Sequence, residues 1–331
     1  MDKTSLGEAI AATGLAVERV LLPGMNLWRD ATPATELAYV LEGELEVWTG
    51  QTKLGRIAAH ELVGEAGFWP GQVRTAAVSA SERCRLLVLD REHLPVLRTD
   101  HQVLYDRLLD TALKALARRV RSVDQDIAKK AHGSRERPTR GNAKWWRKVV
   151  DQLRGTDPGD PPPAEAVLRR LPALKGCPTP VMMRIKRALK TRSYRKGEAI
   201  FMEHDEGKDL FLVAGGKVEV LRNARGDRAI ELATLSAGAL FGTGCWLLDG
   251  RRNASCIVTS DHAWVYQLTP EATRGLEPEA ARTWREAVAE ALRHQLATAD
   301  EHIAALNRSG KEPDPDDYDR IAGVLAAFQP E

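Results

Sequence analysis

The sequence predicts a mainly β chain with helices, built from two tandem jelly-roll β-sandwiches that are each followed by a long helix. Three observations lead to this prediction. The chain has 331 residues, about twice the usual length of a domain, so two domains are expected. A pattern of short strands separated by glycine turns occurs twice, and such strands are typical of sandwiches and jelly rolls. A long helix with a regular apolar seam follows each copy.

The internal repeat is the strongest of these observations. Residues 37–47 and 210–220 both form an apolar strand, a glycine turn and a second, alternating strand. The offset of 173 residues between them also places Gly24 on Gly197. Further along the offset becomes 178, so we expect the second copy to have a hairpin loop five residues longer, in a surface connection that tolerates insertion. The chain is therefore a duplication.

A long helix is predicted after each copy, the first over residues 103–127. Its apolar side chains recur at alternating steps of four and three residues: Leu109, Leu113, Leu116, Val120, Val123 and Ile127. After the second copy the same spacing is found at Leu292, Leu296, Ala299, Ile303 and Leu306. Such seams pair helices, either with each other in one chain or across a homodimer through helix 103–127. The alternative is that each seam covers its own sandwich.

Composition and termini favour a cytoplasmic protein. Hydrophobic residues make up 43% of the chain and charged residues 28%, as in ordinary globular proteins. No apolar run is long enough to span a membrane, and the first residues lack the pattern of a secretion signal. Instead, Ser5 and Glu8 have the spacing of a capping box and predict a short helix. The four cysteines have no metal-binding or disulfide spacing, so we expect a reducing compartment and no metal.

Changes in composition divide the chain further. We expect a first domain at 1–128, a basic, proline-rich linker with a tryptophan-containing helix at 129–163, a second domain at 164–308 and an acidic tail at 309–331. Residues 129–154 have a local net charge of +7, and residues 311–331 one of −4. Because such blocks often mark partner sites, we expect a protein partner to bind the linker 129–154 or the C-terminal tail.

Two further roles of the linker stay open. A basic helix with paired tryptophans, Trp145 and Trp146, suits peripheral contact with an anionic membrane, or else both rings pack on a sandwich. Nucleic acid is not favoured as a partner, since the basic residues lie in one linker without a recognisable reading motif.

One segment of the first copy carries the chemistry. It consists of Gly64-Glu65-Ala66-Gly67-Phe68-Trp69 followed by Arg74-Thr75-Ala76-Ala77-Val78. This segment resembles the phosphate-binding cassette of cyclic-nucleotide-binding domains, such as those of the catabolite activator protein and of kinase regulatory subunits. The pattern of that family is Gly-Glu, a small residue two positions later, and an arginine about nine positions after the glutamate. The resemblance covers about residues 15–128 and 164–308.

The resemblance implies that the first domain binds cyclic AMP (cAMP) or cyclic GMP (cGMP). It assigns the phosphate to Arg74 and the ribose hydroxyl to Glu65, with further contacts from Gly64, Ala66, Gly67, Thr75 and Ala76. A planar guanidinium can hold two phosphate oxygens, and small residues let backbone N–H groups approach. The alternative is a structural Glu65–Arg74 salt bridge in an inactive sandwich. Val73 and Ala77 depart from residues common in the family, which leaves the identity of the ligand open.

The second copy keeps only part of the motif. It retains Gly242, Arg252 and Ser255, but has Thr243 at the position of the glutamate. Loss of a charged acceptor costs about 1.5–3 kcal/mol, or one to two decades of affinity. We therefore expect this second site to be degenerate, either silent or repurposed.

The sequence predicts a sensor that is not an enzyme. It contains no nucleophile elbow, no Walker loop and no cupin-type cluster among its dispersed histidines. We expect a non-catalytic cyclic-nucleotide sensor that binds ligand in the first domain and signals through helix movement to a protein partner. The alternative is a ligand-free scaffold that uses degenerate cyclic-nucleotide-binding folds for interaction.

Overall fold

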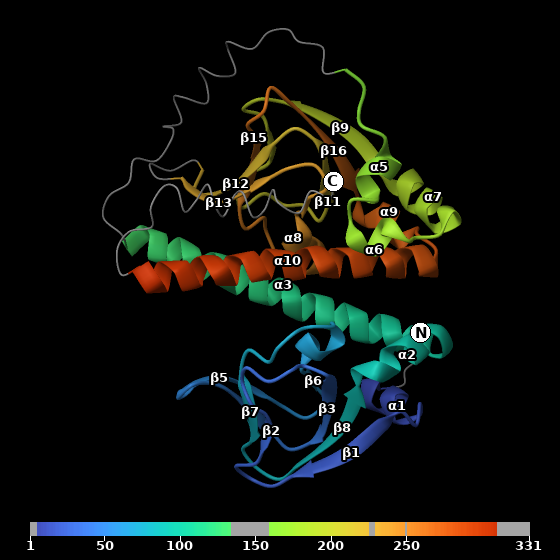
Figure 1. Ribbon diagram of the computed structural model, residues 1–331, viewed down its shortest axis with the longest axis vertical. Coiled ribbons are helices and arrows are strands. Elements are labelled where there is room, and N and C mark those ends of the chain that lie inside the picture. Colours follow the sequence, from blue (N-terminus) through green and yellow to red (C-terminus); the bar gives the residue numbers. More distant parts are fainter. Residues whose placement is uncertain (1–4, 134–158, 225–228, 249, 310–331) are drawn as a thin grey trace. The chain divides into compact units, whose positions relative to one another are not determined.

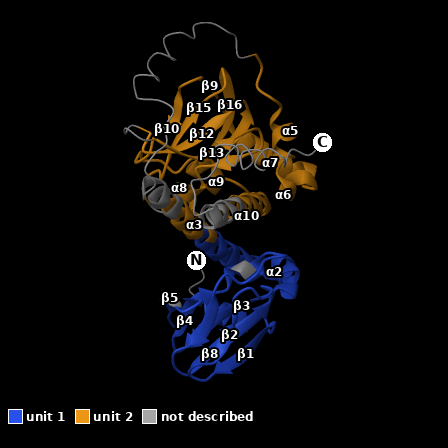
Figure 2. Ribbon diagram, turned by 60° about the vertical axis from the view of Figure 1, so that its left-hand side comes forward, with its two compact units in different colours: residues 1–115 blue, residues 116–331 orange. Residues whose placement is uncertain are grey.

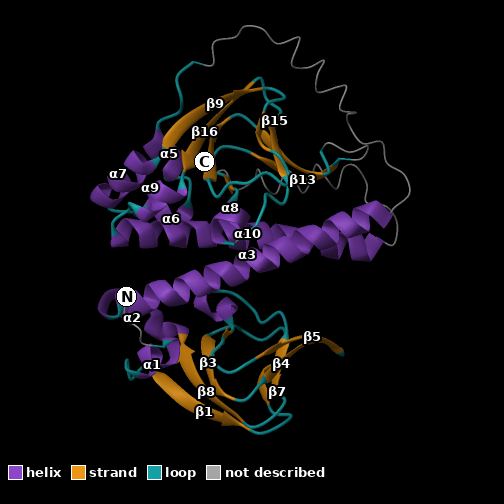
Figure 3. Ribbon diagram, turned by 180° about the vertical axis from the view of Figure 1, so that it is seen from behind, coloured by secondary structure: helices purple, strands orange, loops and turns teal. Residues whose placement is uncertain are grey.

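The structure is a computed structural model that describes residues 5–133, 159–224, 229–248 and 250–309 (Figure 1). The chain divides into two compact units, residues 1–115 and 116–331 (Figure 2). In each unit the strands gather into a sandwich and the helices lie outside it (Figure 3). The predicted fold class is confirmed.

Unit 1 contains one short helix and eight strands before its long helix. Helix α1 (Leu6–Ala11) begins with the predicted capping box, in which the Ser5 hydroxyl accepts the Glu8 N–H and the Glu8 carboxylate accepts the Ser5 N–H. The strands are β1 (Ala16–Leu21), β2 (Asn26–Trp28), β3 (Glu36–Glu42), β4 (Leu45–Thr49), β5 (Thr52–Ile57), β6 (Leu62–Val63), β7 (Ala77–Ala80) and β8 (Cys84–Asp90). The remaining elements are the 3-10 turns η1 (Glu65–Phe68) and η2 (Arg91–His93) and the helices α2 (Leu94–Asp100) and α3 (Gln102–Gly133).

The strands of unit 1 form two antiparallel four-stranded sheets. Their orders are β1-β8-β3-β6 and β2-β7-β4-β5, so neighbours in a sheet are distant in sequence, as in a jelly roll. Alternate side chains of both sheets point inward and form one core, which includes Leu21, Trp28, Val40, Leu45, Val63, Val78, Leu86 and Val88.

Unit 2 repeats this architecture. Its strands are β9 (Lys190–Arg195), β10 (Ala199–Phe201), β11 (Leu210–Gly215), β12 (Val218–Arg222), β13 (Ile230–Leu235), β14 (Leu240–Phe241), β15 (Ser255–Val258) and β16 (His262–Leu268). Its helices are α5 (Ala164–Leu168), α6 (Pro172–Lys175), α7 (Thr179–Ala188), α8 (Thr243–Leu247), α9 (Pro270–Arg274) and α10 (Pro278–Ser309). The sheet orders, β9-β16-β11-β14 and β10-β15-β12-β13, pair equivalent strands.

The register of the duplication follows the predicted offsets. Strand β12 begins 173 residues after β4, and β16 begins 178 residues after β8. The step between the two offsets falls in the hairpin loop that precedes β13, which is five residues longer than the turn between β4 and β5. The insertion therefore lies in a surface loop and leaves the sheets unchanged.

The long helices extend beyond the predicted ranges, to 32 residues each for α3 and α10. The first members of each predicted seam are buried: Leu109, Leu113 and Leu116 in α3, and Leu292 and Leu296 in α10. The later members from Ile127 and from Ala299 onward have side chains outside the described set. How the two seams pair stays a prediction.

Several predictions concern parts of the chain outside the description. Most of the linker 129–163, with its basic stretch and its tryptophan-containing helix, and nearly all of the tail 309–331 lie outside the described residues. Within the described ranges, no helix is long and apolar enough to cross a bilayer. In the same ranges no group of three or more His, Cys, Asp or Glu side chains could hold a metal ion.

Candidate functional site

The predicted cassette of unit 1 lies between strands β6 and β7 and contains the turn η1. Two of its glycines are required by close approaches of the chain. At Gly64, where φ is +84°, a Cβ would lie 2.4 Å from the Trp28 ring and 2.7 Å from Nη1 of Arg74. At Gly67 a Cβ would lie 2.2 Å from the carbonyl oxygen of Glu36. The glycines of the motif therefore let η1 pack directly on β3 and on the arginine.

Arg74 is the centre of this packing and is only 4% exposed. Its Nη2 donates to the carbonyl oxygen of Glu36 at 2.6 Å, and its Nη1 donates to that of Gly64 at 3.4 Å. The guanidinium carbon lies 3.6 Å from the centroid of the Trp28 ring, a cation–π geometry. The Nε atom is buried and has no hydrogen-bond partner.

The charge of Arg74 is incompletely compensated. Burial lowers the pKa of its guanidinium to about 10, and the carboxylates of Glu36 and Glu65 act in the opposite direction. The group is protonated at neutral pH, but it lies where desolvation disfavours a cation. An anion placed beside it would be stabilised by the same charge.

Two residues that the sequence analysis did not single out support this arginine. The indole N–H of Trp28 donates to Oε1 of Glu36 at 2.6 Å, and Arg19 pairs with the same carboxylate at 2.9 Å. Trp28 is thereby fixed with one ring face against Arg74. The signal that could have identified it is the repeat, because the offset of 173 places Trp28 on Phe201, an aromatic residue in the equivalent strand.

The other cassette residues differ in exposure. Glu65 and Ala76 are half-buried and Thr75 is exposed, while the side chain of Ala66 is not described. The ion pairs found among the described residues include none between Glu65 and Arg74. The structure thus brings Gly64 and Gly67 against the arginine and its partners, and leaves the carboxylate of Glu65 outside any such pair.

The arginine of the second copy has the same environment. Arg252 is 4% exposed, and it donates to the carbonyl oxygens of Asp209 at 2.8 Å and Gly242 at 3.2 Å. Its guanidinium carbon lies 4.2 Å from the centroid of the Phe201 ring. These contacts are equivalent to those of Arg74 at every point, so the arginine alone does not distinguish a binding copy from a silent one.

The remaining residues of the second motif are divided. Thr243 is 6% exposed at the start of α8, after Gly242, whose φ is +78°. Ser255 is 1% exposed, and its hydroxyl accepts the N–H of Glu203 at 2.9 Å. The hydroxyl of Ser255 therefore has a structural role in the sandwich.

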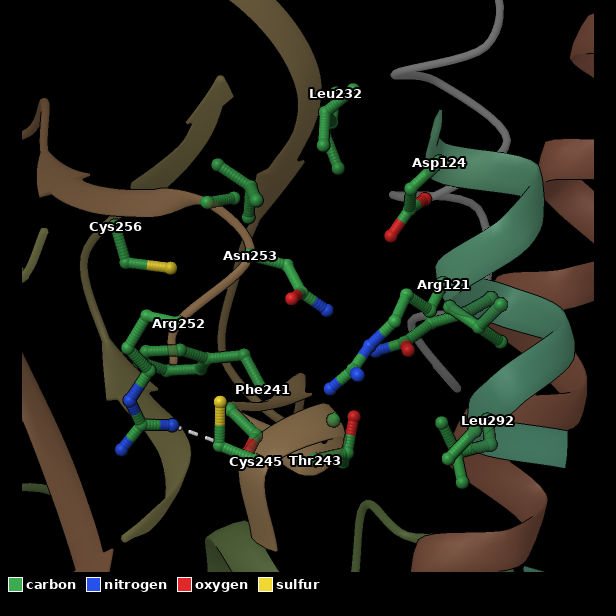
Figure 4. Close-up of a pocket in the computed structure, with 18 of the residues that line it drawn as sticks. Arg121, Asp124, Leu232, Phe241, Thr243, Cys245, Arg252, Asn253, Cys256 and Leu292 are labelled. Atoms are coloured by element: carbon green, nitrogen blue, oxygen red, sulfur yellow. Dashed lines mark hydrogen bonds between the residues drawn. The ribbon is translucent and has the colours of Figure 1, made fainter. Parts of the chain in front are cut away.

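A cavity of about 180 Å³ lies beside this second cassette (Figure 4). Gly242, Thr243, Arg252 and Asn253 line it from the sandwich, and Leu292 and Gln295 line it from α10. Helix α3 adds Ala117, Val120, Arg121 and Asp124, all of which belong to unit 2. Arg121 and Asp124 were not predicted, since the apolar seam draws attention to Val120 and Val123 and carries no signal for the polar residues between them.

A family model matches both copies of the repeat. The model described as "Cyclic nucleotide-binding domain" matches residues 18–101 and 191–276, together just over half of the chain. Over 70 residues the chain is 41% identical to the cyclic AMP receptor protein of Thermus thermophilus, covering 21% of this chain and 32% of that protein. Over 91 residues it is 34% identical to human cGMP-dependent protein kinase 2, covering 27% of this chain and 12% of that protein. The chain thus spans a third or less of the length of these relatives.

Two solved structures illustrate the likeness. The regulatory domain of Toxoplasma gondii PKA with cAMP is 17% identical, with a TM-score of 0.33 over 88% of this chain and 90% of that chain. The catabolite activator protein of Thermus thermophilus is 29% identical, with a TM-score of 0.37 over 41% of this chain and 63% of that chain.

Proposed function

This chain belongs to the cyclic nucleotide-binding domain family, and we propose that its first domain, residues 1–128, is a working cAMP or cGMP site. The protein is then a non-catalytic sensor whose ligand state is passed through α3 to a protein partner. The observation that carries the proposal is the cassette of unit 1, in which a buried arginine with unused donors lies in the same motif as an unpaired glutamate.

The donor count of Arg74 leaves room for a phosphate. A guanidinium has five N–H donors, and two of them point to the carbonyl oxygens of Glu36 and Gly64. Nε–H is among the three that remain, and it is buried without a partner. The ring of Trp28 covers one face of the group, so a ligand would approach its edge, where bidentate hydrogen bonds to phosphate form.

Glu65 supplies what the second copy lacks. A carboxylate accepts hydrogen bonds from a ribose hydroxyl, and that of Glu65 is not consumed by an ion pair among the described residues. Its location in η1, immediately after Gly64, fits the role that the family assigns to this position.

Aromatic contacts connect the cassette to the helix that follows. Phe68, at the end of η1, lies 4.6 Å from Trp69 and 5.5 Å from Tyr105 of α3, measured between ring centroids. A shift of η1 on ligand binding would change the Phe68–Tyr105 contact and so bias the position of α3. Helix α3 leads into the basic linker, which makes residues 129–154 the proposed partner surface, with the acidic tail as the second proposal.

The first test is calorimetric titration of the nucleotide-free full chain with cAMP and with cGMP. We expect binding that weakens about 10- to 100-fold in Glu65→Gln, because the charged acceptor is lost while size is preserved. Glu82→Gln is the matched control, since Glu82 is exposed and has no side-chain partner in the described structure. Failure of the wild-type chain to bind either nucleotide, or equal binding by Glu65→Gln, would overturn the proposal.

The second candidate function is a ligand-free scaffold. It is favoured by one observation, namely that both cassette arginines donate inward to backbone carbonyls and so stabilise the sandwich without a ligand. A scaffold predicts no binding at the first domain, so the same titration separates the two functions.

A further inference from the structure

The cavity of unit 2 contains a charged side chain without protein partners. Arg121 extends from α3 into the cavity, between Asn253 and Thr243 as drawn in Figure 4. Its Nε and Nη2 atoms are buried, and neither has a hydrogen-bond partner. A buried guanidinium with empty donors is costly, and the cost is removed when a ligand supplies acceptors.

Asp124 adds an acceptor of opposite charge on the same helix face. It lies one turn beyond Arg121, and its carboxyl group points into the same cavity (Figure 4). Burial raises the pKa of this carboxyl group to about 6, with only the charge of Arg222 acting against it. Among the described residues Asp124 has no ion pair with Arg121. Side chains three residues apart on a helix are about 5–6 Å apart at Cβ, so one ligand edge can reach both.

The walls between these groups are apolar. Ala117 and Val120 line the cavity from α3, Leu292 lines it from α10, and Val220 and Leu232 line it from the sandwich. An apolar cleft with a few convergent polar groups is the usual form of a small-molecule site. The apolar walls suit a planar ring, and the polar pair suits a ring edge on which an acceptor lies next to a donor.

Among purine bases this edge belongs to guanine. Guanine presents the acceptors O6 and N7, which arginine binds in a bidentate manner, next to the donors N1–H and N2–H. Adenine presents an amino group where Arg121 would need an acceptor, and a ring nitrogen where Asp124 would need a donor. Unpaired buried donors and acceptors discriminate strongly between ligands of equal size.

We propose that the cavity of unit 2 is a second ligand site that binds a guanine-bearing ligand, with Arg121 donating to the O6 edge and Asp124 accepting from N1–H and N2–H. The ligand is either cGMP, whose phosphate would lie toward the Arg252 cassette, or guanosine. The second copy is then repurposed, because the recognition lost with the cassette glutamate at Thr243 is supplied by α3 at the base.

The test is titration of the nucleotide-free full chain with cGMP, guanosine and cAMP, carried out in the Glu65→Gln background so that the first domain contributes little. We expect cGMP or guanosine to bind at least tenfold more tightly than cAMP. Asp124→Asn and Arg121→Met should each weaken guanine binding about 10- to 100-fold and bring the preference over cAMP close to one. Arg118→Met is the matched control, because Arg118 is exposed on the same helix.

Each outcome decides a separate point. Equal affinity for the guanine and adenine ligands, or a preference unchanged by Asp124→Asn, would overturn the proposal. Binding of guanosine as tight as that of cGMP would show that the base alone is read, whereas binding of cGMP alone would show that the phosphate is also held; both support a guanine site. The first domain is tested by Glu65→Gln, so either site can fail while the other stands.

Discussion

Replacing Asp124 by asparagine should stabilise the protein at neutral pH. In the folded chain burial raises the pKa of this carboxyl group from 3.8 to about 6, and Arg222 opposes the shift. A shift of about two pKa units corresponds to about 3 kcal/mol. Arg121 and Arg252 also line the cavity, and both are permanently charged, so they do not titrate with it.

The sign follows from proton linkage. The folded pKa is above the unfolded one, so the folded state holds the proton more tightly and this group favours folding below about pH 4. The free energy of unfolding then falls as the pH rises from about 4 to 6, and the full cost is present above pH 6. Asparagine is neutral and nearly isosteric, so it removes this cost. We expect Asp124→Asn to raise the free energy of unfolding at pH 7.5 by at most about 3 kcal/mol, and to leave it unchanged at pH 4.

The assay is urea unfolding of the full chain at both pH values, followed by circular dichroism, with Asp160→Asn as the control. Asp160 is exposed in the same unit. Two units can unfold in separate transitions, so the midpoint of the transition that Asp124→Asn moves is the quantity to compare. An equal effect at pH 4 and 7.5, or a loss of stability at pH 7.5, would refute the reasoning, because the carboxylate would then have partners in the folded protein. Excess cGMP should stabilise the wild type more than the variant, since a ligand stabilises in proportion to its affinity.

Three further predictions concern packing. Gly67→Ala should destabilise unit 1 by about 1–3 kcal/mol in urea unfolding, because its Cβ would lie 2.2 Å from the Glu36 carbonyl oxygen, whereas Gly55→Ala, with open space, should be near neutral. Trp28→Phe keeps a ring against the arginine but loses the 2.6 Å bond to the Glu36 carboxylate, so we expect a loss of about 1–2 kcal/mol; no loss would mean that water replaces the indole N–H. All four cysteines are free and buried, so a thiol reagent should modify them only as fast as the chain opens, and rapid labelling of the folded chain would contradict this burial.

Local patterns predicted most of the fold. The glycine turns and alternating strands predicted two sandwiches, and the change of offset placed the insertion in the loop before β13. The capping box at Ser5 and the seam of α3 were also readable, because each depends on residues within one or two helical turns. These features require only short sequence separations.

What the sequence did not predict depends on contacts between distant residues. The inward bond from Arg74 to Glu36 joins residues 38 apart, and no local pattern specifies it. Arg121 and Asp124 reach a cavity whose other walls come from strands and from α10. Periodicity identifies the side of a helix that is apolar, but it does not say which cavity the neighbouring polar residues line.

The two cassettes show why a motif is incomplete evidence of binding. Arg74 and Arg252 have equal exposure, equivalent carbonyl acceptors and an aromatic ring against one face, so selection for a stable sandwich alone would retain both. A copy that has lost its glutamate can therefore keep its arginine without any ligand. The residues that separate binding from bracing are those whose polar atoms have no protein partner: Nε of Arg74 in unit 1, and Nε and Nη2 of Arg121 in unit 2. Buried donors of this kind are rare in folded proteins because each costs free energy, so the two groups indicate where a ligand belongs in each unit.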